Sequence, residues 1–452
     1  MRQAFQLLKD DRRARFFFFA LAQSAVGTGA GYVALLLIAY ERFESPWAVG
    51  LVLFADLLPA MLLGPLFGAA ADRWSKRTCL IVADVMRAAA FLGIAVVPSF
   101  EATIALAILA GTGTGLFTPA GLSVLPSLVG EQRLPAATAL YGVLADLGFT
   151  VGPALAAGLL LFLDPAALTA INGASFGLSA VVLVFLRFGA TSRAEQSEQP
   201  PSVLLEAWRG VATVATMPVV RVVLLASSAA LFCGGLFNVA ELPFATRELN
   251  AGDAGFSLLV TLFGLGFVIG SLSGAGGGAL LQLRVRYELG LLLMALSLVG
   301  LALSQVLFVA ALAFTAAGIG NGAMLVYERL IIQSVTPETL QGRVFGIKDS
   351  LTAWAFAVAF LSAGGLMDLA GLRPMLFLAG GLGIAVWLGA TMALRSAASG
   401  LPRRSAGVRR YGPGGKKSTH FVRGVNAGLE FTHDTDERVD NAGVELGSGT
   451  RE

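Results

Sequence analysis

The chain has 452 residues, of which 56% are hydrophobic and only 13% are charged, whereas soluble proteins carry roughly 25% charged residues. Two segments, residues 102–130 and 289–327, contain no Asp, Glu, Lys or Arg. Uncharged apolar runs longer than about 18 residues indicate membrane-spanning helices, so we expect a protein embedded in the lipid bilayer. The net charge of +3 does not indicate nucleic-acid binding, because the basic residues are spread between the apolar segments.

Apolar stretches of spanning length recur along the whole chain. In order, they lie near residues 16–38, 47–70, 78–97, 103–127, 137–162, 167–186, 219–240, 256–281, 288–304, 306–327, 345–369 and 374–394. The uncharged stretch 289–327 must fold back near Ser304 and Gln305, because one helix of that length would extend about 58 Å, twice the hydrocarbon thickness. The sequence therefore predicts an all-α membrane protein with twelve transmembrane helices.

Basic residues in the short loops lie mainly on one side of this arrangement. If the N-terminus is cytoplasmic, the only basic residues in the loops on the opposite side are Arg42, Arg247 and Arg373. The positive-inside rule then places both termini in the cytoplasm, with the helices in the bacterial cytoplasmic (inner) membrane as a multi-pass protein.

A polar segment at residues 187–218 divides the spans into two groups. It separates an N-terminal six-helix half, residues 1–186, from a C-terminal six-helix half, residues 219–394. The segment begins as a TSRAEQSEQPPS linker and continues as VLLEAWRGVATV, whose helical spacing predicts an interfacial helix on the cytoplasmic surface. Residues 395–452 lack apolar periodicity, which predicts a disordered cytoplasmic tail.

The loop between the second and third spans, residues 68–77, reads GAAADRWSKR. It combines a small residue for close packing, an acid that can cap or pair, and a basic cluster, at Gly68, Asp72, Arg73, Lys76 and Arg77. This spacing resembles the signature of the major facilitator superfamily, with Ser75 in place of the second glycine. The alternative is a cluster of cytoplasmic basic residues with an Asp at this spacing by chance.

Further segments extend the resemblance over about residues 14–394. In chain order they read LLPAMLLGPLFGAAADRWSKR, ADVMRAAAF, GLFTPAGLSVLPSLV, INGASFGLSA and VTPETLQGRVFG. Together they look like the branch that contains the enterobactin exporter and the macrolide efflux proteins. The resemblance implies a major facilitator fold and efflux of a small amphipathic molecule that is drug-like, macrolide-like or siderophore-like.

The fifth span contains Gly148, Gly152 and Pro153, and small residues at this spacing let helices approach closely. The pattern resembles the family's antiporter motif, GxxxGPxxGG, with Ala156 and Ala157 replacing the last two glycines. That resemblance implies export. The alternative interpretation is a helix that is merely closely packed.

Charged residues at membrane depth are costly and are usually retained inside a bundle or a water-filled cavity. Asp56 and Asp146 each lie about 14 Å from a helix end, at about 1.5 Å per residue. Because a carboxylate in a partly dry cavity can bind and release a proton, we take both as candidates for proton coupling. Alternatively, each is a structural acid bonded to a neighbouring helix, or Asp56 faces the outer vestibule.

Asp84 and Arg87 are spaced i, i+3 in the third span, close enough to pair on one face. We interpret them as a structural pair that joins the network of the 68–77 loop and latches the halves on the cytoplasmic side, forming a gate. Glu241, just before Pro243, is interpreted as a solvated charge at the rim of the seventh span, and the alternative is a ligand for the substrate.

Aromatic residues in the spans are candidates for the lining of a substrate cavity, although Phe is also common on surfaces that face lipid. The candidates are Phe54, Phe117, Phe149, Phe237 and Phe263.

Catalytic patterns are missing from the sequence. His420 and His433 both lie in the predicted tail, and no phosphate-binding loop or metal-ligand spacing is present. We therefore expect a transporter rather than an enzyme, with no cofactor or metal. We further expect a secondary active transporter that is monomeric and is driven by the proton gradient. The alternative is proton-independent uptake, or lysophospholipid flipping, on the same fold.

Overall fold

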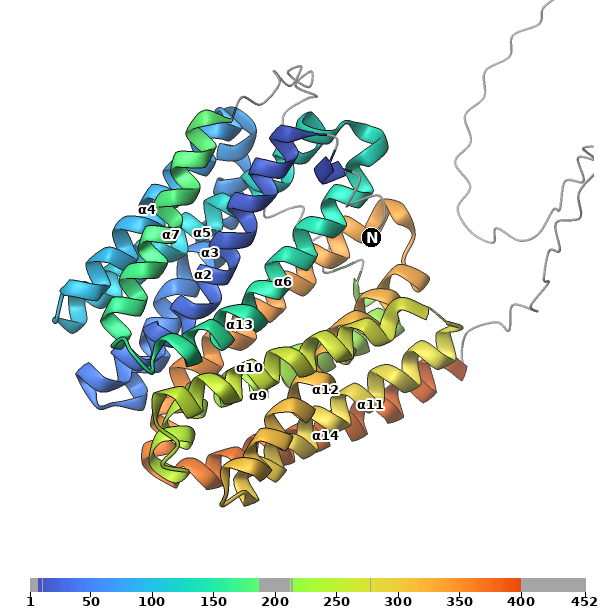
Figure 1. Cartoon of the computed structure of the whole chain (residues 1–452). Coiled ribbons are helices and arrows are strands. Elements are labelled where there is room, and N and C mark those ends of the chain that lie inside the picture. The colour runs from blue at the N-terminus through green and yellow to red at the C-terminus, as the bar shows by residue number, and fades with distance from the viewer. Residues whose placement is uncertain (1–6, 10, 187–211, 213, 277, 400–452) are drawn as a thin grey trace, which may run out of the picture. The chain divides into compact units, whose positions relative to one another are not determined.

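The computed structural model describes residues 7–9, 11–186, 212, 214–276 and 278–399. Within them, twelve helices are long and apolar enough to cross a membrane, which confirms the predicted number. They are α2 (Arg12–Phe43), α3 (Pro46–Arg73), α4 (Lys76–Val96), α5 (Phe100–Val129), α6 (Leu134–Leu159), α7 (Pro165–Phe185), α9 (Pro218–Pro243), α10 (Gly252–Leu272), α11 (Leu280–Leu303), α12 (Leu307–Val335), α13 (Glu338–Ala370) and α14 (Leu372–Ser399) (Figure 1). The fold-back expected near Ser304 is confirmed, because α11 ends and α12 begins on either side of it.

Side-chain caps fix several of the helix starts. Asp11 accepts a 2.7 Å hydrogen bond from the backbone N–H of Arg13, and Asp164 accepts one of the same length from Ala167. Such caps satisfy backbone donors that the first helical turn leaves without partners. Ser75 caps α4 through the backbone N–H of Thr78, so the residue that replaces the signature glycine begins the third span.

Glycines let the helices within each half approach closely. A Cβ on Gly148 of α6 would lie 2.4 Å from the backbone oxygen of Ala25 on α2, and one on Gly152 would lie 2.5 Å from the backbone N of Ala30. The motif in the fifth span thus packs against the first span. In the second half, Gly266 of α10 packs against α12 in the same way.

The helices form two groups, α2–α7 and α9–α14 (Figure 1). Across the boundary between the groups, α3 packs against α13 and α6 packs against α10. We call the end of the bundle where α2 begins the Arg12 end, and the end where α2 finishes the Phe43 end.

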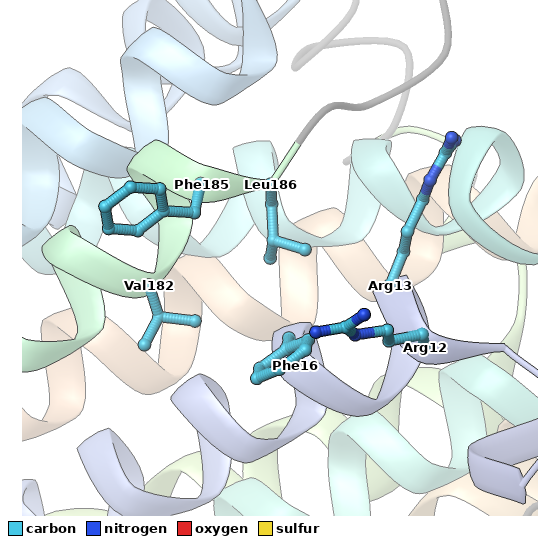
Figure 2. Close-up of a pocket in the computed structure, with 6 residues that line it drawn as sticks. All are labelled: Arg12, Arg13, Phe16, Val182, Phe185 and Leu186. Carbon is cyan, nitrogen blue, oxygen red and sulfur yellow. The ribbon is translucent and has the colours of Figure 1, made fainter.

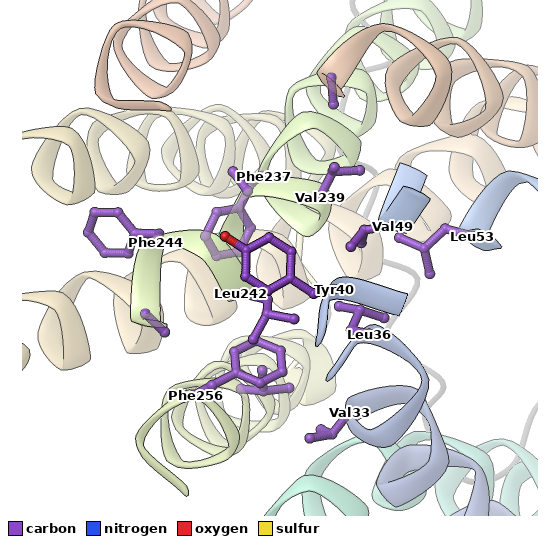
Figure 3. Close-up of a cluster of buried hydrophobic side chains, with 14 of the residues drawn as sticks. Val33, Leu36, Tyr40, Val49, Leu53, Phe237, Val239, Leu242, Phe244 and Phe256 are labelled. Carbon is purple, nitrogen blue, oxygen red and sulfur yellow. The ribbon is translucent and has the colours of Figure 1, made fainter. Parts of the chain in front are cut away.

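The two ends differ in how their hydrophobic cores are built. At the Phe43 end a single cluster contains residues of both groups, including Leu36 and Leu53 from the first and Phe237 and Leu242 from the second (Figure 3). At the Arg12 end, each of the three remaining large clusters belongs to one group alone. Within the described part of the chain, the halves therefore share a large hydrophobic core at the Phe43 end only.

Several predictions fall outside the described residues. The predicted linker and most of the interfacial helix lie in residues 187–211, and most of the predicted tail lies in residues 400–452. The linker, the interfacial helix and the tail remain predictions.

Candidate transport site

The predicted pair in the third span is a buried ion pair. Arg87, which is 6% exposed, bonds the carboxylate of Asp84, which is fully buried. The guanidinium lies 4.2 Å from the ring centre of Phe117 on α5 and 4.3 Å from that of Phe176 on α7. A desolvated guanidinium between two rings gains cation–π stabilisation, so α4, α5 and α7 together enclose this charge.

Asp56, half-buried on α3, is near enough to this pair to interact with Arg87 electrostatically. No hydrogen bond or ion pair joins its side chain to another residue in the part of the chain that the structure describes. Its backbone oxygen lies against α5, where a Cβ on Gly111 would come within 1.8 Å of it. Helix packing thus holds Asp56 in place, and its carboxylate bonds directly to no other described residue.

Asp146, the other candidate for proton coupling, lies on α6. Its side chain and that of Phe149 are outside the described part of the structure. Their proposed roles rest on the sequence alone.

Glu241 overturns a prediction, because it is not a solvated rim charge. Its side chain is 4% exposed, and Tyr32 of α2 donates a 2.8 Å hydrogen bond to Oε1. Helix α9 continues to Pro243 and is followed by a π-helical turn at Phe244–Glu248, which places Glu241 inside the packed bundle. The hydrogen bond joins the first half to the second at the shared core.

The basic side chains at the Phe43 end of the bundle have other partners. Arg247 lies 4.8 Å from the ring centre of Tyr40, and Arg373 pairs with Glu248 at 2.7 Å. Arg42 donates to backbone carbonyls at the end of α4. Consequently Glu241 forms no ion pair with any cation among the residues described.

A second buried acid lies in the C-terminal half. Glu328 of α12 is 1% exposed, and Ser227 of α9 lies close enough to interact with its carboxylate. Lys348 of α13 interacts with it electrostatically. Close by, Tyr287 of α11 and Ser227 of α9 share a buried 2.9 Å hydrogen bond. This polar cluster lies toward the Arg12 end.

The predicted aromatic candidates fall into different surroundings. Phe237 is buried in the shared core, where its ring centre lies 5.0 Å from that of Phe314 and 6.3 Å from that of Phe263. Phe54 and Phe263 are partly buried against the same core and keep some exposed surface. Phe117 instead packs on Arg87.

A pocket of about 550 Å³ lies between α2 and α7 at the Arg12 end. It is lined by Arg12, Arg13, Phe16, Val182, Phe185 and Leu186, and the Arg12 guanidinium lies over the Phe16 ring (Figure 2). None of the candidate transport residues lines this pocket, so we do not assign it to the transport site.

The sequence profile of the Major Facilitator Superfamily matches residues 17–347 of this chain. The chain belongs to the Major Facilitator Superfamily. Membership in this transporter family makes it a transporter rather than an enzyme, and it confirms the resemblance inferred from the motifs.

Two of the curated relatives that this chain resembles are named for efflux. The chain is 26% identical over 372 residues to the multidrug efflux pump Tap of Mycobacterium tuberculosis, covering 78% of this chain and 87% of that one. It is 24% identical over 382 residues to macrolide efflux protein A of Streptococcus pyogenes, covering 81% and 92%. Among solved structures, the nucleoside transporter NupG aligns with a TM-score of 0.71 at 9% identity, covering 85% and 99%, which shows the shared fold.

The facilitator signature loop makes its described contacts inside the first half. Lys76 donates a 2.7 Å hydrogen bond to the backbone oxygen of Ser123 on α5, and Arg77 donates to backbone oxygens of Leu183 and Val184 at the end of α7. Cations at the carboxyl ends of helices are favourably placed. The side chains of Gly68, Asp72 and Arg73 lie outside the described residues, so a latch between the halves remains a prediction.

Sequence reasoning misassigned Glu241 as a rim charge and missed Glu328, because the predicted spans ended too early. The seventh span was expected to end at residue 240 and the tenth at 327, each one residue before an acid. The helices α9 and α12 continue to Pro243 and Val335. An acid next to a predicted span end was the available signal, since span boundaries from hydropathy alone are imprecise.

Proposed function

We propose that this facilitator exports small amphipathic molecules from the cytoplasm across the bacterial inner membrane, as a monomer, in exchange for protons. The observation that carries this proposal is the shared core at the Phe43 end, set against separate cores at the Arg12 end. Alternating access needs two halves that part at one end while they stay joined at the other.

The distribution of basic residues supports the orientation. Arg12, Arg13, Lys76, Arg77 and Arg133 all lie at the Arg12 end. By the positive-inside rule this end faces the cytoplasm, so the joined Phe43 end faces outward. A substrate then enters between the halves from the cytoplasm, which is the loading state of an exporter.

Efflux relatives support the direction of transport, and the aromatic residues support the class of substrate. Tap and macrolide efflux protein A are both named as efflux proteins and match most of this chain. Phe54 and Phe263, which keep some exposed surface beside the shared core, offer aromatic surface to an amphipathic molecule.

Proton coupling is proposed for Asp56 and Asp146. A buried acid in a membrane bundle is costly when charged, and a proton removes that cost. Asp56 suits this role because its carboxylate bonds directly to no residue that the structure describes, whereas Asp84 is already paired with Arg87. For Asp146 the proposal rests on its depth in the fifth span.

A growth-inhibition panel identifies a substrate by comparing a deletion strain with strains that produce the wild-type chain. Efflux of that substrate is then measured in cells with and without a protonophore, for wild type, Asp56→Asn, Asp146→Asn and the exposed control Asp368→Asn. We expect the protonophore to stop wild-type efflux, and at least one of the first two substitutions to abolish it while the control retains it.

Other outcomes would change the proposal. Efflux that persists with the protonophore would favour proton-independent flipping, and faster accumulation in producing cells would favour uptake. If neither Asp56→Asn nor Asp146→Asn altered transport, the assignment of the proton sites would be wrong.

A further inference from the structure

Glu241 is a carboxylate inside the bundle whose neutralising partner is not supplied by the described part of the chain. Among the described residues it bonds only the phenol of Tyr32, across the boundary between the halves. The charged groups of the surrounding helix ends are otherwise engaged: Arg42 with the end of α4, Arg247 with Tyr40, and Arg373 with Glu248. Asp368 at the end of α13 is exposed.

Such an arrangement is unfavourable for the chain alone. An ionised carboxylate that is taken out of water costs several kcal/mol unless a positive charge and hydrogen bonds offset the loss of hydration. One phenol hydrogen bond offsets only part of this cost. A positive charge that arrives from outside the chain would therefore bind here favourably.

Aromatic residues of the shared core add to this preference for a cation. Phe237 lies one helical turn before Glu241 on α9, so the two share a face of the helix. Its ring belongs to a cluster with Phe263 and Phe314. The ring of Tyr32 is half-buried and keeps exposed surface. Aromatic rings attract organic cations through their faces and also hold the apolar part of an amphipathic molecule.

We infer that Glu241 and Tyr32 form a binding subsite for the positively charged nitrogen of an amphipathic substrate, an organic ammonium group. This inference deepens the proposed function and rests on it for the role of the subsite in transport. The contrast with Asp84 supports it, because Arg87 already neutralises that acid and leaves no charge for a ligand. A cation held at Glu241 lies between α2 and α9 and contacts both halves.

The subsite is tested by binding to the purified full-length chain in lipid nanodiscs. Ethidium, a permanent cation, and Nile red, a neutral dye, are titrated against wild type and three variants, with binding followed by dye fluorescence. Glu241→Gln removes the charge and keeps the shape, and Glu241→Asp keeps the charge. Glu248→Gln is the matched control, because Glu248 lies on the same span and already pairs with Arg373.

We expect Glu241→Gln to weaken ethidium binding about tenfold or more, since a buried charge partner is lost. Nile red binding should stay within about twofold, and Glu248→Gln should leave both dyes unchanged. Glu241→Asp should retain more than half of the ethidium signal at saturation. The melting temperature of each variant verifies that the protein is folded.

Three results would overturn the inference: a wild-type chain that does not bind ethidium, a folded Glu241→Gln protein that binds ethidium as wild type does, or equal losses for both dyes. Binding in nanodiscs requires neither a gradient nor a direction of transport. Failure of the proposed export, seen as protonophore-insensitive or inward transport in cells, is therefore distinguishable from failure of the subsite.

Discussion

Asp84 and Glu241 are both buried acids in membrane-spanning helices, but their surroundings differ in one decisive respect. Asp84 has Arg87 three residues away on its own helix, and two phenylalanine rings enclose that cation. Glu241 has only the hydroxyl of a tyrosine from the opposite half as a partner in the part of the chain that the structure describes. The first acid is neutralised within one half, and the second is left for a group that the described chain does not provide.

This difference separates a structural charge from a candidate transport charge. An internal ion pair is costly to desolvate, but its attraction is already satisfied within the protein, so it offers no net charge to a ligand. An acid that lies at the boundary between two moving halves changes its surroundings when they part. Position and partner together, rather than depth in the membrane alone, therefore identify the residues to test.

The largest expected effect comes from breaking the paired acid. Arg87→Met removes the cation and leaves Asp84 buried without compensation, which should destabilise the protein by about 3–5 kcal/mol. Yield of folded protein and thermal unfolding in detergent measure the loss. The double variant Asp84→Asn with Arg87→Met should recover most of it, because no unpaired charge remains.

A single Arg87→Met variant as stable as wild type would contradict the comparison. It would mean that Asp84 is neutral in the folded protein or has another partner. The contrast with Glu241 would then fail.

An intermediate effect is expected when Glu241 loses its one donor. Tyr32→Phe removes the hydroxyl and should cost about 1.5–3 kcal/mol, the range for hydrogen bonds to charged groups. The loss should appear as a lower melting temperature and as increased labelling of a cysteine introduced at Ser45, at the Phe43 end. In the Glu241→Gln background the same substitution should cost less, because the acceptor is then neutral.

Equal effects of Tyr32→Phe in both backgrounds would show that the hydroxyl does not act through the carboxylate. The four proteins form a double-mutant cycle, which isolates the interaction from the loss of tyrosine packing. The phenylalanine that replaces Tyr32 keeps the aromatic ring in both backgrounds, so packing changes cancel.

The sequence predicted what depends on local spacing and missed what depends on contacts between distant segments. Hydropathy located twelve spans, and an i, i+3 spacing located the pair of Asp84 and Arg87. The rings that enclose Arg87 come from two other helices, and Tyr32 and Glu241 are 209 residues apart. No periodicity within one helix contains that information.

Span boundaries were the second source of error. Charged residues lower the local hydropathy. A predicted span therefore tends to stop at an acid even where the helix continues beyond it. This is why Glu241 was interpreted as a rim charge although α9 extends beyond it. Hydropathy therefore tends to place a functional acid near the end of a span outside the predicted membrane segment.

The smallest expected effect is at the exposed pair of Glu248 and Arg373. Glu248 extends the comparison to an acid that has a cationic partner and is also exposed to solvent. The two side chains are 34% and 29% exposed, and their atoms lie 2.7 Å apart. Exposed pairs contribute about 0–1 kcal/mol, so Glu248→Gln should shift the melting temperature little, and increasing salt should reduce the difference further. Arg373 keeps its hydrogen bonds to the backbone oxygens of Ala302 and Ser304, which limits the loss. If Glu248→Gln destabilised the protein as much as Arg87→Met does, solvent would not be weakening the ion pair of Glu248 with Arg373. The distinction between the buried Glu241 and the exposed Glu248 would then be lost.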